Sequence, residues 1–200
     1  SEEELIGIIG EYDGLMIRSG TQVTAAVIAA ASRLKIIGRA GVGVDNVDVP
    51  AATQRGVLVV NSPEGNTIAA AEHALAMMLT LSRHIPQAHG GMRAGKWDRK
   101  KYVGNELYKK TLGVVGLGKI GSHVARVAQA MGMEVIAYDP FIAADRAQRM
   151  QVKLLELDEL FRTADYVTLH IPRTKDTENL VNAELLRTMK PTARIVNCAR

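Results

Sequence analysis

The strongest chemical signal in the sequence is a run of glycines in TLGVVGLGKIG, where Gly116, Gly118 and Gly121 form a G-x-G-x-x-G pattern. An apolar segment precedes the pattern and a helical segment follows it, which is the context in which such glycines bind a dinucleotide. The first glycine allows a tight turn, the second lets a pyrophosphate approach the backbone, and the third lets helix and strand pack closely. The pattern therefore predicts a phosphate site at the N-terminus of a helix.

An acidic residue lies at the distance from these glycines that dinucleotide binding requires. Asp139 ends the next apolar segment, 139 − 121 = 18 residues after Gly121, and the usual spacing is about 20. A carboxylate at this position accepts hydrogen bonds from the adenine-ribose hydroxyls and repels a 2′-phosphate. The sequence therefore predicts NAD rather than NADP as the cofactor.

Two further apolar segments end in residues that could face the same site, because ligands of open α/β sheets bind at the carboxyl ends of the strands. His170 ends one segment, and we expect it to line a pocket rather than to shuttle protons. Cys198 follows the other segment, and we interpret it as a small buried residue beside the cofactor. Arg200 could polarise a carbonyl group and hold a carboxylate through two parallel hydrogen bonds.

The N-terminal third contains two loops that could bind an anion. Arg18 begins the loop RSGT and Arg39 begins the loop RAGVGVDN, and each loop follows an apolar segment. Taken alone, the second loop could be a tight turn without a ligand. Two arginines at strand ends, with backbone N–H groups left accessible by glycines, favour an anion site instead.

The elements that must position these residues form two series in which short apolar strands alternate with helices. This alternation predicts two doubly wound parallel sheets, each covered by helices on both faces. A cluster of turn residues, NSPEGN, indicates a boundary between domains at residues 1–63 and 64–200. In the first series we expect helices at residues 1–9, 24–31 and 50–55, and strands at residues 14–18, 34–38 and 57–60.

The second series begins after a long helix that starts at Asn66 or Thr67. Its apolar positions are Ile68, Ala71, Leu75, Met78 and Leu79, and Pro86 is expected to end or kink it. We expect the strands of this series at residues 112–115, 134–138, 166–170 and 193–196, and its helices at residues 120–131, 157–163 and 183–189.

The composition is that of an ordinary globular protein, with 47% hydrophobic residues and a net charge of 25 − 21 = +4. Much of the positive excess lies between Arg93 and Lys110, and such a patch attracts nucleic acid or a small anionic substrate. The single cysteine fits a reducing compartment, and no apolar run is long enough to span a membrane. We expect a cytoplasmic protein without metal, nucleic-acid or membrane partners, and a plastid form is the open alternative.

Three stretches, LGVVGLGKIG, ADYVTLHIPRTKDTENLVN and MKPTARIVNCAR, match motifs of one family. On these motifs the chain resembles the D-2-hydroxyacid dehydrogenases over its whole length. The stretches GRAGVGVDNVD, NSPEGNTIAAAEHALAMML and GKWDRKKYVGNELYKKTLG further resemble members that oxidise a phosphorylated 2-hydroxy acid. The resemblance implies a flavodoxin-like substrate domain, a Rossmann domain that binds NAD, and hydride transfer from the substrate to NAD.

The resemblance also implies roles for individual residues. Arg200 matches the catalytic arginine of the family, and Val42 stands where some relatives have a threonine that contacts the cofactor. Together, the glycine pattern and the resemblance predict cofactor contacts at Val42, Gly116, Gly118, Lys119, Ile120, Gly121, Asp139, His170, Ile171, Pro172, Cys198 and Ala199. The resemblance implies substrate contacts at Arg18, Ser19, Arg39, Gly41 and Asn66.

Several parts of the family pattern have no counterpart in the 200 residues. The family uses a glutamate and a histidine together with the arginine, but the remaining histidines, His73, His84, His89 and His123, match no catalytic position. The two glycines that follow the arginine are absent, as is a strand before the first helix. We therefore expect an internal piece of a longer enzyme, in which both domains are incomplete and which is inactive alone.

Two alternative functions stay open from the sequence. The first is a reductase of the same family that acts on glyoxylate or hydroxypyruvate. The second is an NAD-sensing corepressor, a binding protein with the same fold. The aromatic residues Trp97, Tyr102 and Tyr108 among the basic residues 93–110 are typical of an interface. We therefore expect a homodimer, or a dimer of dimers, built on this segment and the helix from Thr67.

Overall fold

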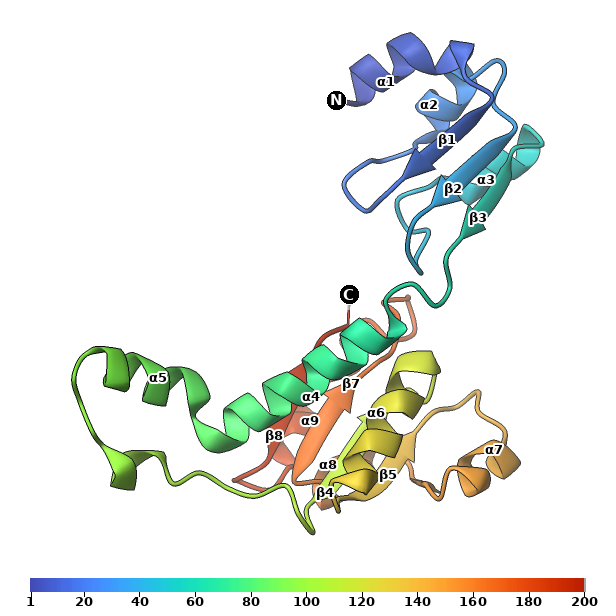
Figure 1. Cartoon of the computed structure of the whole chain (residues 1–200). Helices are drawn as coiled ribbons and strands as arrows, with labels where there is room; N and C mark the ends of the chain where they lie inside the picture. Colours follow the sequence, from blue (N-terminus) through green and yellow to red (C-terminus); the bar gives the residue numbers. More distant parts are fainter. Residues whose placement is uncertain (200) are drawn as a thin grey trace. The chain divides into compact units, whose positions relative to one another are not determined.

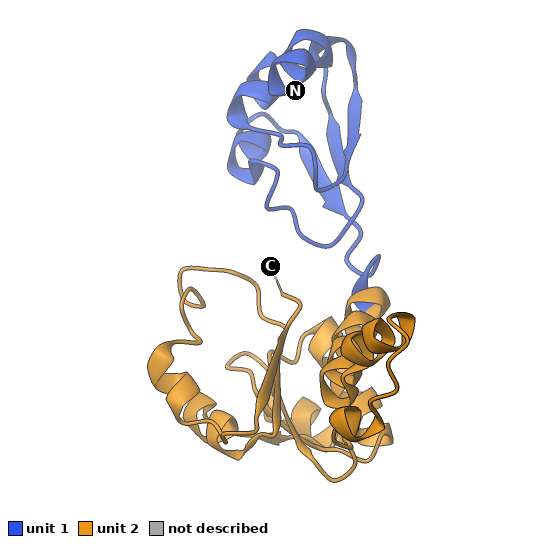
Figure 2. Cartoon of the chain, turned by 90° about the vertical axis from the view of Figure 1, so that its left-hand side faces the viewer, with its two compact units in different colours: residues 1–67 blue, residues 68–200 orange. Residues whose placement is uncertain are grey.

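The computed structural model describes residues 1–199 and divides the chain into two compact units, Ser1–Thr67 (unit 1) and Ile68–Arg200 (unit 2; Figure 2). Each unit is built around one parallel sheet, with three strands in unit 1 and five in unit 2. The sequence placed the division after residue 63, in the turn ahead of the first helix of unit 2. No helix within residues 1–199 combines the length and the apolar character needed to cross a membrane.

Unit 1 begins with the predicted helix, whose N-terminus carries a capping box formed by Ser1 and Glu4. Thr24 caps the second helix, and Asp48 caps the third, which has Pro50 in its first turn. The elements in chain order are α1 (Glu2–Ile8), η1 (Ile9–Glu11), β1 (Gly14–Ile17), α2 (Ala25–Ala30), β2 (Ile36–Arg39), α3 (Val49–Gln54) and β3 (Leu58–Asn61) (Figure 1).

The sheet of unit 1 has the order β1-β2-β3 and two unlike faces. One face carries Ile17 and Ile37, which are buried in a core with residues of the three helices. Met16 points to the other face and is 83% exposed, and Leu58 is exposed as well. The helices of unit 1 therefore cover one face of its sheet, as Figure 2 shows, so the prediction of helices on both faces is wrong for this unit within residues 1–67.

Unit 2 has a five-stranded parallel sheet with the order β6-β5-β4-β7-β8. Its first strand lies at the centre, which gives the order 3-2-1-4-5 of dinucleotide-binding folds. The elements are α4 (Thr67–Arg83), α5 (Ile85–Arg93), η2 (Arg99–Tyr102), β4 (Thr111–Val115), α6 (Lys119–Ala130), β5 (Glu134–Tyr138), α7 (Ala144–Arg149), β6 (Lys153–Leu154), α8 (Leu157–Thr163), β7 (Tyr166–Leu169), α9 (Ala183–Arg187) and β8 (Arg194–Asn197).

Helices cover both faces of the unit 2 sheet. On one face, Leu112 and Val114 of β4 pack in one core with residues of α4 and α6. On the other face, Val115 packs in a second core with residues of α8 and α9. A Cβ atom at Gly113 would overlap the side chain of Leu160, so this glycine lets α8 approach the central strand closely.

The long helix α4 differs in detail from its predicted pattern. Ala71, Leu75 and Met78 are buried as predicted, but Ile68 and Leu79 are exposed, so these two residues are not part of the core. Ser82 is buried, and its hydroxyl lies 2.8 Å from the hydroxyl of Tyr166, which links α4 to β7. The predicted break is confirmed, because α4 ends at Arg83, ahead of a new helix with Pro86 in its first turn.

Candidate functional site

The carboxyl ends of four strands in unit 2 lie in register at one edge of the sheet. Val115 of β4 pairs with Tyr138 of β5 and with Leu169 of β7, and Leu169 pairs with Asn197 of β8. Each strand is followed at once by a residue that was predicted to contact the cofactor. The structure therefore brings together Gly116, Asp139, His170 and Cys198.

The three glycines after β4 have distinct steric roles. Gly116 has a φ of 94°, and a Cβ atom there would lie 2.9 Å from the carbonyl oxygen of His170. A Cβ atom at Gly121 would overlap the carbonyl oxygen of Gly116, so helix and loop meet too closely for any side chain. At Gly118, the N-cap of α6, a Cβ atom would meet nothing within 4 Å. The open space at Gly118 and the helix N-terminus behind it fit a pyrophosphate.

Asp139 follows β5, and its carboxylate accepts hydrogen bonds from backbone groups of two segments, the glycine loop and the residues just after β5. Its Oδ2 accepts a hydrogen bond from the N–H of Leu117 in the glycine loop (2.7 Å). Its Oδ1 accepts from the N–H groups of Phe141 (2.9 Å) and Ile142 (3.1 Å). The carboxylate is therefore held beside the glycine loop, where an adenine ribose would lie in a dinucleotide complex. The sequence could not predict the contact with Leu117, because its donor is a backbone N–H group, which every residue except proline has.

His170 follows β7 and is mostly buried at the same edge. Its Nε2 lies 2.9 Å from the hydroxyl of Thr168, a fully buried residue of β7. Burial lowers the pKa of His170 to about 4, so its ring is neutral near pH 7. A neutral, hydrogen-bonded ring is suited to line a pocket, whereas a proton shuttle needs a pKa close to the working pH.

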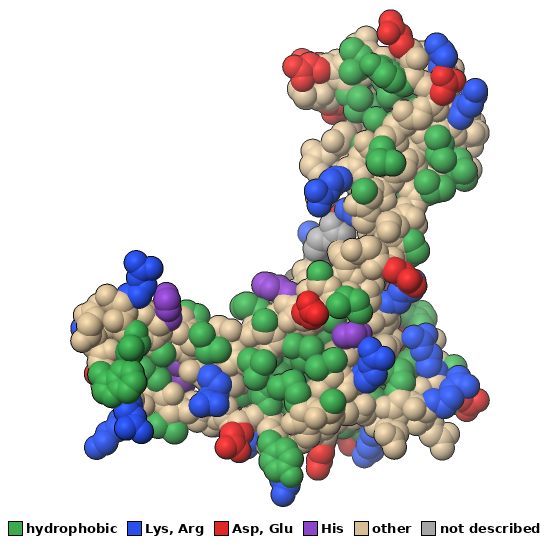
Figure 3. All heavy atoms as spheres, in the orientation of Figure 1, with side chains coloured by type: hydrophobic (Ala, Val, Ile, Leu, Met, Phe, Trp, Pro, Cys, Tyr) green, Lys and Arg blue, Asp and Glu red, His purple; other side chains and the backbone are tan. Residues whose placement is uncertain are grey.

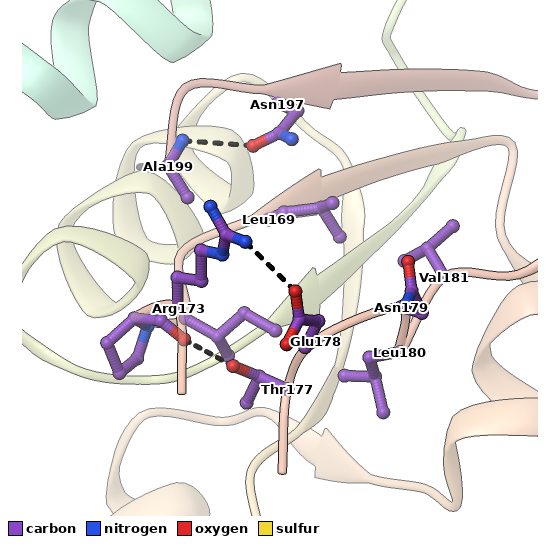
Figure 4. A pocket seen from close by; sticks show the side chains of 11 residues that line it. Leu169, Arg173, Thr177, Glu178, Asn179, Leu180, Val181, Asn197 and Ala199 are labelled. Atoms are coloured by element: carbon purple, nitrogen blue, oxygen red, sulfur yellow. Dashed lines mark hydrogen bonds and ion pairs between the residues drawn. The ribbon is translucent and has the colours of Figure 1, made fainter. Parts of the chain in front are cut away.

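A pocket of about 350 Å³ opens next to this edge, between the segments that follow β7 and β8 (Figure 4). Arg173 and Glu178 form an ion pair across it (Nη2 to Oε1, 2.9 Å), and the Thr177 hydroxyl donates to the carbonyl of Pro172 (2.6 Å). We did not predict these polar residues, although they lie in the quoted stretch ADYVTLHIPRTKDTENLVN. The apolar part of the lining consists of Leu169, Ile171, Pro172, Leu180, Val181 and Ala199.

The carboxyl edge of the unit 1 sheet carries a buried cation. Arg39 ends β2 and is only 6% exposed, and its Nε is buried without a hydrogen-bond partner within residues 1–199. A Cβ atom at Gly41 would overlap the Arg39 guanidinium, so the glycine leaves room for the arginine side chain. No carboxylate pairs with Arg39 in the described part of the chain. A buried charge without a partner is destabilising, and an anion bound here would compensate it.

The loops around Arg39 are held by the side chain of Asn46. Its Nδ2 donates to the carbonyl groups of Arg18 (2.9 Å) and Thr21 (2.6 Å). This contact fixes the loop that carries Arg18 and Ser19, both of which are exposed at the same sheet edge as Arg39. The Oδ1 of Asn46 is buried and has no partner among the described residues. We did not predict a role for Asn46, because the backbone carbonyl groups that it contacts are distant in the sequence.

A family model covers most of the chain. The model described as "D-isomer specific 2-hydroxyacid dehydrogenase, NAD binding domain" matches residues 75–200. The chain belongs to the D-isomer specific 2-hydroxyacid dehydrogenases. This assignment confirms the predicted family and the predicted NAD-binding domain of Rossmann type.

Curated relatives of this dehydrogenase family match the whole chain. A D-3-phosphoglycerate dehydrogenase of Synechocystis sp. is 66% identical over 200 residues, which are 100% of this chain and 36% of the relative. A D-3-phosphoglycerate dehydrogenase of Archaeoglobus fulgidus is 52% identical over 200 residues, again 100% of this chain and 38% of the relative. The chain thus spans little more than a third of the length of these relatives.

Solved structures of similar fold confirm the predicted α/β class. The TT0316 protein of Thermus thermophilus superimposes with a TM-score of 0.92 at 35% identity, covering 100% of this chain and 63% of that one. D-lactate dehydrogenase of Aquifex aeolicus, solved with NAD and lactic acid, superimposes with a TM-score of 0.87 at 30% identity, covering 100% and 59%.

The remaining residues that were predicted to act in this dehydrogenase site lie in several places. Lys119 is exposed at the start of α6, and Ile120 is partly buried against the core. Cys198 also packs against that core, and burial raises the pKa of its thiol, so the group is protonated near pH 7. Val42 lies in unit 1, where its carbonyl accepts a hydrogen bond from the Nδ2 of Asn61 (2.6 Å).

Of the two remaining predicted positions, only Asn66 lies within the described residues. Asn66 is exposed in the turn ahead of α4, and within residues 1–199 no hydrogen bond joins its side chain to Arg18, Ser19 or Arg39. Arg200, the predicted catalytic residue, lies outside the described residues.

Proposed function

We propose that the chain is part of an NAD-dependent D-3-phosphoglycerate dehydrogenase. Its reaction is the oxidation of 3-phospho-D-glycerate to 3-phosphohydroxypyruvate, which begins the phosphorylated route to L-serine. The names and the identity of the curated relatives support this assignment. The observation in the structure that carries it is the buried Arg39, whose Nε has no partner within residues 1–199, because the phosphate or the carboxylate of this substrate would compensate its guanidinium.

In this proposal the edge of the unit 2 sheet binds the cofactor. The N-terminus of α6 and the open side of Gly118 receive the pyrophosphate, and the Asp139 carboxylate accepts from the adenine ribose. The apolar pocket beside Ile171 and Leu180 receives one of the ring systems of the cofactor. Bound NAD supplies the acceptor for the hydride that leaves the substrate.

The substrate is held by cationic and backbone donors. Arg39 and Arg18 neutralise its anionic groups, and Ser19, Gly41 and Asn66 provide hydrogen-bonding groups around them. Arg200 is proposed to fix the substrate carboxylate and to stabilise charge on the carbonyl oxygen as it develops. In this proposal His170 is not the proton acceptor, because burial lowers the pKa of its ring to about 4 and makes it a weak base near pH 7.

A turnover assay on the full-length protein tests the function. We expect NAD reduction with 3-phosphoglycerate to exceed that with glycerate. In the reverse direction, with NADH, we expect 3-phosphohydroxypyruvate to be reduced faster than glyoxylate. Faster reduction of glyoxylate or hydroxypyruvate would assign the protein to the reductases of the family. Binding of NAD without turnover of any of these compounds would favour an NAD-sensing binding protein.

Replacing Arg39 by methionine in the same protein tests the observation that carries the proposal. The KM for 3-phosphoglycerate should rise by about tenfold or more, since a hydrogen-bonded charge pair contributes roughly 1.5–3 kcal/mol. Arg33→Met is the control, because Arg33 forms an exposed ion pair with Asp13 in unit 1 and such pairs contribute little. An unchanged KM in Arg39→Met would contradict the role of Arg39.

We also propose a homodimer, or a dimer of dimers, and a cytoplasmic location. Trp97 is 72% exposed and Tyr108 is exposed in the basic segment 93–110, and Met77 and Leu81 are exposed on α4. Large apolar side chains of this kind are common interface anchors. Light scattering of the full-length protein at micromolar concentration should therefore give the mass of a dimer or tetramer. A monomer would contradict the proposal.

A further inference from the structure

The outer surface of α6 in unit 2 forms one wall of a second pocket, of about 530 Å³. The other wall is the end of α7 with the turn that follows it. A volume of this size is in the range of small-molecule sites. The lining residues are Lys119, Ser122, His123, Arg126, Gln129, Arg149, Met150 and Gln151.

The sequence of α6 divides the helix into two faces. Its buried residues, Gly121, Val124, Ala125 and Ala128, face the core of unit 2. The pocket residues of α6 recur at steps of three and four residues and therefore form a separate polar stripe along the helix. This stripe is not needed for packing against the sheet.

Hydrogen bonds from Gln129 hold the second wall in place. Its Nε2 donates to the carbonyl groups of Met150 (3.0 Å) and Gln151 (3.1 Å), in the turn after α7. Gln151 has a φ of 54°, so the turn adopts the left-handed conformation there. The side chain of Gln129 thus connects α6 to the turn, and these hydrogen bonds fix the positions of the two pocket walls relative to each other.

The pocket is strongly cationic. Three of its eight lining residues are Lys or Arg, and none of the eight is acidic. Within residues 1–199, neither Arg126 nor Arg149 forms an ion pair. In Figure 3, several blue side chains (Lys or Arg) and a purple one (His) gather over the region of α6 and α7. Two arginines that line one cavity, neither of them in an ion pair among the described residues, favour binding of an anion.

A hydrogen bond partly orients the arginine of α6. The Nη2 of Arg126 lies 3.0 Å from the Nδ1 of His123. A guanidinium is always protonated and can only donate, so Nδ1 is the acceptor and the neutral imidazole carries its proton on Nε2. The remaining N–H groups of Arg126 and the Nε2–H of His123 are donors without an acceptor among the described residues.

We propose that this pocket binds an oxyanion of the phosphate class, held between Arg126 on α6 and Arg149 at the end of α7. A guanidinium binds phosphate oxygens through two parallel hydrogen bonds, and arginines on both walls can grip one ligand. The proposed anion ligands Arg126 and Arg149 are not among the predicted cofactor residues, and the lining includes neither Gly116 nor Asp139 nor any residue of the 350 Å³ pocket. Lys119 borders both the α6 pocket and the glycine loop.

Calorimetric titration of inorganic pyrophosphate into the full-length protein, saturated with NAD, tests the proposal. Saturation with NAD prevents the probe from binding at the glycine loop. We expect saturable binding that weakens about tenfold or more in Arg126→Ala and in Arg149→Ala, since charge-assisted hydrogen bonds are lost. Arg126→Lys should bind with intermediate affinity, because it keeps the charge and loses the planar fork.

Arg146→Ala is the matched control, since Arg146 is an exposed arginine of the same helix α7 that does not line the pocket. The affinity of the Arg146→Ala variant for pyrophosphate should stay within about twofold of that of the unmodified protein, because salt screens distant surface charges. The proposal is wrong if pyrophosphate does not bind saturably, or if Arg126→Ala and Arg149→Ala bind it normally. It is also wrong if Arg146→Ala weakens binding as much as they do. Thermal melts of all variants show whether each one is folded.

Discussion

A charged side chain lies at the carboxyl edge of each sheet, and the two side chains differ in whether the protein satisfies their hydrogen bonds. At the edge of unit 2, the carboxylate of Asp139 accepts from three backbone N–H groups, so it is satisfied without a ligand. At the edge of unit 1, Arg39 is buried and its Nε has no partner among residues 1–199. The first edge is preorganised by the fold itself, and we propose that a bound anion completes the second.

This difference separates two ways in which a substitution can act. At the unit 2 edge the backbone makes the site, so added atoms should disturb folding or cofactor approach. At the unit 1 edge a charge makes the site, so its removal should weaken substrate binding and also relieve a cost to stability. The following predictions test that contrast.

The largest effect is expected for Gly121→Ala. The new Cβ atom would overlap the carbonyl oxygen of Gly116, which belongs to the backbone and cannot move aside easily. We expect unit 2 to lose about 1–3 kcal/mol of unfolding free energy, or more, as in other overpacked sites. NAD binding should fall below detection in equilibrium titrations. Gly118→Ala is the matched control, because its Cβ atom meets nothing within 4 Å.

The control variant Gly118→Ala should affect stability and NAD affinity differently. Gly118→Ala should keep its stability within about 0.5 kcal/mol, the usual range for unhindered positions. Its affinity for NAD should nevertheless fall by about tenfold, because the methyl group occupies the space through which a pyrophosphate approaches the backbone. Equal destabilisation in the two variants would contradict the steric difference between the two glycines.

A smaller, two-sided effect is expected for Arg39→Met. The variant removes a buried charge and keeps most of the side-chain volume, so the protein without anion should become more stable by about 1–2 kcal/mol. Inorganic phosphate should raise the melting temperature of the unmodified protein more than that of the variant, by linkage. Loss of stability in Arg39→Met without anion would show that Arg39 has a partner in the full-length protein.

A smaller effect, on cofactor affinity and preference, is expected for Asp139→Ala. The preference for NAD over NADP should narrow, because the like-charge contact with a 2′-phosphate is removed. NAD affinity should also fall by about tenfold, since the N–H of Leu117 loses its acceptor and the glycine loop loses a contact. Competition titrations with NAD and NADP measure both quantities. Equal affinity for the two cofactors in the unmodified protein would refute the assignment of Asp139.

The smallest effect concerns pH. The pKa of His170 is lowered by burial from 6.5 to about 4, so the folded state binds fewer protons than the unfolded state between these values. Its contribution to stability is complete above pH 6.5 and is lost as the pH falls toward 4. The melting temperature should therefore drop by a few degrees between pH 7 and pH 5, and less so in His170→Gln. His89→Gln, at an exposed histidine of α5, should behave like the unmodified protein.

Local sequence patterns were sufficient to predict most elements of the fold. Capping residues, such as Ser1 with Glu4 and Thr24, and apolar runs bounded by turn residues depend on near neighbours in the chain. The elements that were missed include the helix α7 and the two-residue strand β6. α7 has a single buried residue, Ala147, and β6 is too short to show alternation, so neither has a pattern that stands out.

The sequence by itself determined where chemistry could occur, because in a parallel sheet the residue after each strand must lie at the carboxyl edge. The position of Gly116, Asp139 and His170 at one edge of the sheet follows from that rule.

Only the tertiary structure decided what those side chains experience. The burial of Arg39, the exposure of Ile68 and Leu79, and the bond from Leu117 to Asp139 depend on segments that are distant in sequence. The charge of a residue is a property of the residue type, but its solvation and its partners are properties of the packed chain.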